Sequence, residues 1–161
     1  MPNYTLEQLG NEGPQFAMAM LIRCLKYGES FITYGEIRDE LQHQLEIKTI
    51  FPTQIGHVAG SLMNQILSLD PKAPLINALI TRPDGLPGKG VGDYFANRYK
   101  KERYRKWDKV SSKEKRILVD KERIKVLRYT NWEKLNEKLF GTTATKKLRK
   151  KSGSEKDGHS Y

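Results

Sequence analysis

Cysteine and histidine are scarce in this chain of 161 residues, which has one cysteine and three histidines. The single Cys24 cannot form an internal disulfide, and it stands among Ala17, Met20, Leu21 and Leu25. We predict a buried structural thiol at this position rather than a nucleophile. The three histidines show no spacing typical of zinc ligands. We therefore expect no metal, no cofactor and no catalytic residue.

Long apolar runs are also lacking. A membrane-spanning helix needs a run of about 18 or more apolar residues, and none occurs. The first residues do not show a basic and then apolar leader, so we expect a cytoplasmic protein. The phosphate-loop pattern GxxxxGK[ST] is absent around Gly88-Lys89-Gly90, so we do not expect a phosphate-binding loop there.

Positive charge is abundant and unevenly distributed. The net charge is +10. Residues 1–94 carry 7 Lys and Arg against 10 Asp and Glu, whereas residues 95–161 carry 22 against 9. A near-neutral module followed by a basic extension indicates a polyanionic partner, and nucleic acid is the first candidate. Solvated helices rich in lysine are the alternative interpretation.

The central stretch of the chain, residues 33–94, predicts two helices and a hairpin. Thr33 and Glu36 form a capping-box pattern at the start of a helix that runs to about residue 46. A second helix should begin near Thr53 and end by Leu69, with Ile55, Val58, Leu62 and Ile66 facing the core. Its other face carries polar side chains. In a helix-turn-helix this second helix is the recognition helix.

An apolar first strand over residues 75–80 and a loop over residues 81–90 should complete the hairpin. Asp84-Gly85 is a turn signal within that loop. Arg82 and Lys89 would give the loop a basic tip that meets phosphates. The predicted fold is mainly α with a small β-hairpin, a winged helix-turn-helix followed by a basic helical C-terminal extension.

Helices are expected on both sides of this stretch. A short helical lead-in over residues 4–10 precedes a core helix over residues 11–27, for which Gly28 is the natural end. Further helices are predicted over residues 95–107, 111–128 and 131–140. We divide the chain into a winged-helix module (1–94), a basic helical extension packed on it (95–141) and a disordered basic tail (142–161).

The motif Thr33-Tyr34-Gly35-Glu36-Ile37, the segment 52–63 and the run into Gly92-Asp93-Tyr94 resemble the winged-helix DNA-binding domain of O6-alkylguanine-DNA alkyltransferases and alkyltransferase-like proteins. The resemblance implies that Tyr34 contacts DNA near a flipped nucleotide. The family's intercalating arginine corresponds to Gly56 or His57. Neither the reactive cysteine motif nor its tryptophan variant stands near residues 75–78, so the resemblance implies a DNA-binding scaffold without alkyl transfer.

We predict a non-catalytic nucleic-acid-binding protein that prefers duplex DNA to RNA. Two alternatives are a small nuclease or toxin acting on nucleic acid, and an adaptor that binds an acidic protein partner. No membrane contact is expected, and the oligomeric state stays open. The predicted DNA-binding residues are Tyr34, Thr53, Gln54, His57, Ser61, Asn64, Arg82, Lys89, Arg98, Lys100, Lys101 and Arg103.

Overall fold

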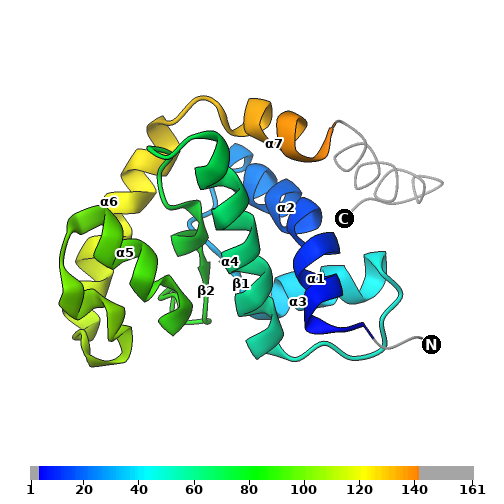
Figure 1. Cartoon of the computed structure of the whole chain (residues 1–161), viewed down its shortest axis with the longest axis horizontal. Coiled ribbons are helices and arrows are strands. Elements are labelled where there is room, and N and C mark those ends of the chain that lie inside the picture. Colours follow the sequence, from blue (N-terminus) through cyan, green and yellow to red (C-terminus); the bar gives the residue numbers. More distant parts are fainter. Residues whose placement is uncertain (1–3, 142–161) are drawn as a thin grey trace.

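The computed structural model describes residues 4–141, and these residues are mainly helical (Figure 1). The predicted tail, 142–161, lies outside the described residues. The α-helices are α1 (Leu6–Glu12), α2 (Pro14–Lys26), α3 (Tyr34–Gln44), α4 (Pro52–Leu69), α5 (Gly92–Tyr99), α6 (Ser112–Arg128) and α7 (Trp132–Phe140). The 3-10 helices are η1 (Ile76–Leu79), η2 (Lys89–Val91), η3 (Glu102–Arg105) and η4 (Trp107–Lys109), and the strands are β1 (Ile32–Thr33) and β2 (Ile80–Thr81).

The capping box at the start of α3 is present as the sequence predicts. The Thr33 Oγ1 accepts from the Glu36 N–H at 3.1 Å, and the Glu36 Oε1 accepts from the Thr33 N–H at 2.9 Å. These two bonds satisfy amide donors that have no partner inside the helix. At α6 only half of such a capping box forms. Ser111 accepts from the Glu114 N–H at 3.1 Å, and the Glu114 carboxylate turns instead to Arg103 and Tyr104.

The N-terminal part of the chain holds two helices with a boundary different from the predicted one. The chain turns at Gly13, and Pro14 occupies the first position of α2, where a missing N–H costs nothing. The expected helix over residues 11–27 therefore begins at residue 14. At the other end of α2, Gly28 has φ +72°, in the left-handed region that favours glycine. Gly28 terminates α2 as predicted.

The mainly helical class and the small β element are confirmed, but the two strands do not form a hairpin. β1 and β2 pair in parallel, with Ile32 opposite Ile80 and Thr33 opposite Thr81. Most of the expected first strand is the 3-10 helix η1. Parallel strands need a long crossover, which α3 and α4 provide here. The hairpin prediction failed because the apolar run pairs with a distant segment.

The extension is less continuous than predicted. The helix expected over residues 95–107 ends at Tyr99, because Lys100 adopts φ +55° and ψ +47°. The two 3-10 helices η3 and η4 follow, and they turn the chain so that Trp107 becomes completely buried. By contrast, α6 and α7 occupy the ranges predicted for them within one residue.

One hydrophobic core joins the predicted module to its extension. Phe16 and Leu21 on α2 and Leu62 on α4 belong to the same buried cluster as Phe95 and Trp107. α2 packs against α4 and also against α7. Phe95 stacks between Tyr99 and Trp107, with ring centroids 5.8 Å and 5.0 Å away. The extension is thus an integral part of the core. Among the described residues, none of the helices is both long and apolar enough to cross a membrane.

The thiol of Cys24 lies in this core, as the sequence predicts. Its side chain is 1% exposed, and the Sγ donates to the Glu29 carbonyl at 3.4 Å. Burial, and then the nearby carboxylates of Glu29 and Glu36, raise the pKa of the thiol to about 11. The protonated form therefore predominates at neutral pH.

A chromogenic disulfide reagent at about pH 8 should react with Cys24 of the folded chain at least about tenfold more slowly than with the chain unfolded in guanidinium. The Cys24→Ser variant provides the blank. Because the folded chain holds this proton more tightly, the free energy of unfolding should fall as the pH rises above the ordinary thiol pKa. Equal reaction rates for folded and unfolded chain would contradict a buried, protonated thiol.

Candidate nucleic-acid interface

The loop over residues 82–91 folds back on itself through its own backbone. The Gly85 N–H donates to the Arg82 carbonyl at 2.9 Å, and the Arg82 N–H donates to the Leu86 carbonyl at 3.0 Å. Asp84 accepts from the Leu86 N–H at 2.9 Å. Gly85 has φ +83°, so the predicted Asp-Gly turn is present.

Three side chains from distant elements hold this loop in place. Tyr34, at the start of α3, accepts from the Gly88 N–H at 2.8 Å. The Trp107 Nε1 donates to the Pro87 carbonyl at 3.1 Å, and the Arg116 Nη2 donates to the Asp84 carbonyl at 3.2 Å. Burial raises the pKa of Tyr34, so its hydroxyl is neutral at physiological pH. The loop is therefore a fixed platform, from which Arg82 and Lys89 extend into solvent.

Much of the polar face of α4 has partners inside the protein. The Gln54 Oε1 accepts from the Phe51 N–H at 2.8 Å and caps the helix. The Ser61 hydroxyl donates to the Gly10 carbonyl on α1 at 2.7 Å. The Tyr94 hydroxyl lies 2.6 Å from the Asn64 Oδ1 and 2.9 Å from the Gly60 carbonyl, and it can donate to either.

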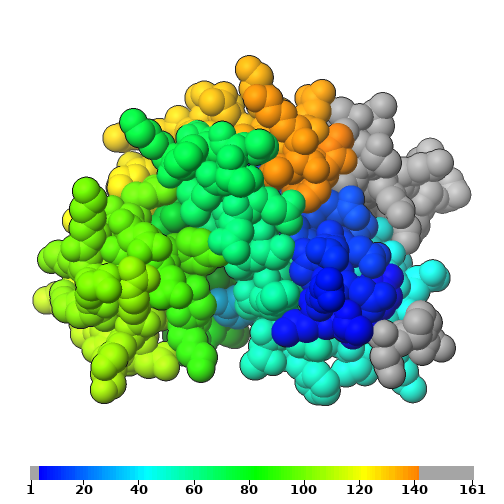
Figure 2. All heavy atoms as spheres, in the orientation of Figure 1, coloured from blue at the N-terminus to red at the C-terminus, as the bar shows by residue number. Residues whose placement is uncertain are grey.

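Two neighbours thus cover the flanks of α4 and leave a strip between them. α1 approaches closely enough that a Cβ on Gly10 would come within 2.8 Å of the His57 Nε2. Tyr94, on α5, covers the other flank. Figure 2 shows α4 exposed between the segments of α5 and α1. Thr53, Gly56, His57 and Asn64 are exposed on α4, and we call these four residues the α4 strip.

The four predicted cations of the extension divide into two pairs. Arg98 donates to the Ala73 carbonyl at 2.6 Å and lies 4.0 Å from a carboxylate oxygen of Glu122. Arg103 donates to the two carboxylate oxygens of Glu114 through its Nη1 and Nη2. Lys100 and Lys101 are exposed, and within residues 4–141 neither forms an ion pair. The sequence alone could not distinguish the two arginines from the two lysines, because the groups that the arginines bind lie on other elements.

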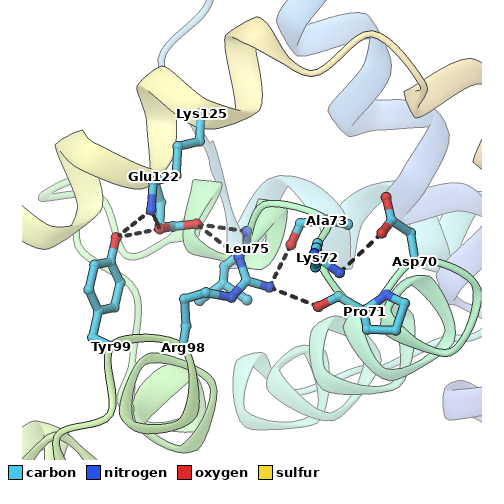
Figure 3. Close-up of polar contacts among 9 residues, drawn as sticks. All are labelled: Asp70, Pro71, Lys72, Ala73, Leu75, Arg98, Tyr99, Glu122 and Lys125. Atoms are coloured by element: carbon cyan, nitrogen blue, oxygen red, sulfur yellow. Dashed lines mark hydrogen bonds and ion pairs between the residues drawn. The ribbon is translucent and has the colours of Figure 1, made fainter.

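Arg98 belongs to a network centred on the buried carboxylate of Glu122 (Figure 3). The Glu122 side chain is 0% exposed. It accepts from the Leu75 N–H at 2.9 Å, from the Tyr99 hydroxyl, and from the Lys125 Nζ at 3.2 Å. A buried carboxylate is stable only when such donors replace water. These contacts join α6 to α5 and to the segment that follows α4.

The groups of this network are occupied by one another, and we assign the network a role in ordering the chain. Burial, reinforced by the Glu122 carboxylate, raises the pKa of Tyr99, so this phenol keeps its proton. Each oxygen of Glu122 already has a donor. Within residues 4–141 the structure contains no group of three or more histidine, cysteine, aspartate or glutamate side chains placed to hold a metal ion.

The tertiary structure also assigns roles that the sequence analysis missed. Glu122 and Arg116 lie on a helix rich in charged residues, and the backbone groups of Leu75 and Asp84 that they contact are 47 and 32 residues away along the chain. Thr5 and Gln8 form a second full capping box, whose sequence pattern is recognisable. Comparison of the chain with models of protein families, with characterised proteins and with solved structures finds no match. The resemblance to alkyltransferases therefore stays a prediction.

Replacing Glu122 with alanine should lower the free energy of unfolding by about 2–4 kcal/mol, because buried donors of Leu75 and Tyr99 would lose their acceptor. Glu122→Gln should cost less, since an amide oxygen can still accept from Leu75. Glu137→Ala, which removes an exposed carboxylate of α7, should stay within about 0.5 kcal/mol. Denaturant unfolding followed by circular dichroism measures all three. Equal stability of the two alanine variants would refute the anchoring role of Glu122.

Replacing Tyr34 with phenylalanine should release the loop at Gly88. The lost hydrogen bond is worth about 1 kcal/mol, which corresponds to about fivefold faster hydrogen exchange at the Gly88 amide. Tyr27→Phe is the matched control, because the Tyr27 side chain is 70% exposed. NMR measures the exchange residue by residue. An unchanged rate at Gly88 would show that Tyr34 does not hold the loop.

Proposed function

We propose that the chain is a non-catalytic nucleic-acid-binding protein that acts on duplex DNA in the cytoplasm. The proposal rests on one observation above all. Two exposed cations, Arg82 and Lys89, extend from a loop whose backbone is held by α3, η4 and α6. A fixed pair of cations can meet phosphates without the entropic cost of ordering a flexible loop. It can also set the register of the protein on the duplex.

The charge distribution supports a polyanionic ligand. Residues 95–141 carry 16 Lys and Arg against 7 Asp and Glu. Several of these cations serve the fold, but Lys100, Lys101, Lys106 and Lys109 are exposed. They follow α5 closely in the chain, and η3, which lies among them, packs against α5. We infer that they provide contacts to phosphates that are independent of sequence.

The α4 strip would supply what sequence or shape preference the protein has. α3 and α4 pack together, and they would form the helix-turn-helix pair, with the loop in the place of the wing. Thr53 and His57 carry polar atoms on the exposed strip and can reach base edges, whereas the Asn64 Oδ1 is already in contact with Tyr94 and only its amide nitrogen is left for such a contact. Gln54 and Ser61 already have internal partners, so we expect them to position α4 and to contribute little directly. Tyr34 likewise acts by holding the loop.

Removing the two loop cations should weaken binding to all duplexes alike. The Arg82→Ala, Lys89→Ala double variant loses phosphate contacts, so the slope of log K against log salt should become shallower by up to about 0.9 per contact. His57→Ala should instead change preference among DNA sequences by about 1–3 kcal/mol and leave the slope nearly intact. Fluorescence anisotropy with labelled duplex DNA, duplex RNA and heparin at about 50 and about 200 mM salt measures both effects.

The Lys134→Ala, Lys138→Ala double variant is the matched control, because it removes the same charge from exposed positions on α7. Circular dichroism checks that every variant is folded. If both double variants lose affinity equally, the loop is no special contact and net charge alone accounts for binding. Absence of DNA binding by the native chain at about 50 mM salt would refute the proposed function.

A further inference from the structure

Helix α6 is apolar on two opposite faces. Leu118, Val119 and Val126 face the core and are at most 4% exposed. Ile117, Ile124 and Leu127 point the other way and are 49%, 50% and 58% exposed. The fold does not require these three side chains to be apolar, because the opposite face already packs the helix onto η1. A soluble helix that needs only one apolar face normally presents charged residues on the other.

The three exposed side chains form a stripe with cations along it. Ile124 follows Ile117 by seven residues and precedes Leu127 by three, so all three share one face of the helix. Lys113, Lys121 and Arg128 stand one turn from members of the stripe. These cations are exposed, and none forms an ion pair within residues 4–141. Asp120 also lies along the stripe, bound to Arg123 at 3.0 Å.

We propose that this outward face of α6 binds an acidic amphipathic helix of a partner protein. An apolar stripe flanked by cations is complementary to a helix with aliphatic residues along one face and carboxylates beside them. The aliphatic side chains would bury each other, and the flanking charges would set partner choice and orientation. This function is separate from DNA binding, which uses the α4 strip and the loop over residues 82–91.

Charge complementarity decides among the occupants. A second copy of the chain would bring the same cations face to face across a two-fold axis, which is unfavourable. An anionic membrane would attract the cations, but the stripe has no tryptophan, tyrosine or phenylalanine to anchor it, and Asp120 would meet like charge. Figure 1 shows α6 at the opposite side of the molecule from α1. Because α1 covers one flank of the α4 strip, the outward face of α6 lies away from that flank.

Two synthetic amphipathic helical peptides with the same leucine face test the proposal, one flanked by glutamate and the other by lysine. The full chain should bind the glutamate peptide at least about tenfold more tightly, with affinity falling as salt rises. Ile124→Glu should abolish this preference. The control Leu6→Glu, at an aliphatic residue of α1 that is 46% exposed, should leave it unchanged. The Lys121→Glu, Arg128→Glu double variant should switch the preference to the lysine peptide.

Failure to bind the glutamate peptide, or equal binding of both peptides, would overturn the proposal. So would a concentration-dependent dimer in sedimentation velocity that Ile124→Glu dissociates, because a second copy would then be the occupant. Binding of anionic vesicles without binding of the glutamate peptide would assign the face to a membrane. The affinity of the Ile124→Glu variant for duplex DNA separates the two functions. This affinity should fall by no more than the effect of one negative charge added elsewhere on the surface.

Discussion

The carboxylate of Glu122 is the interaction on which the arrangement of the second half of the chain depends. It is removed from water, so it must gather donors from whatever surrounds it. Those donors come from the backbone at Leu75, from Tyr99 and Lys125, and more remotely from Arg98. The same Arg98 donates to the Ala73 carbonyl. One buried charge therefore fixes α6, α5 and the segment that follows α4 relative to one another.

That arrangement decides the position of the loop over residues 82–91. The path from α5 through η3 and η4 buries Trp107, whose indole N–H reaches the Pro87 carbonyl. The placement of α6 brings Arg116 to Asp84. Tyr34 completes the support from the other side. Arg82 and Lys89 thus occupy a defined place on the surface because of contacts made by Tyr34, Trp107 and Arg116.

The cations of this protein fall into two groups, those that bind internal acceptors and those that stay exposed. Arg98, Arg103 and Arg116 donate to internal acceptors and order the chain, whereas Lys100 and Lys101 stay in solvent. Arginine suits the first group, because its planar guanidinium group reaches several acceptors at once. The proposed second surface, the outward face of α6, keeps its aliphatic stripe exposed.

The sequence by itself determined the local features. The capping box at Thr33, the glycine end of α2 at Gly28 and the extents of α4, α6 and α7 follow from patterns of residues close together in the chain. The burial of Cys24 was predictable because many of its neighbours in the chain are apolar. Only the tertiary structure decided that β2 pairs with β1 in parallel, that the helix after Phe95 breaks at Lys100, and that Ser61, Arg98 and Arg103 have internal partners. The physical reason is that a charged or polar side chain in a helical pattern has the same local preference whether it faces water or a buried acceptor. The choice is made by groups that folding brings from far along the chain.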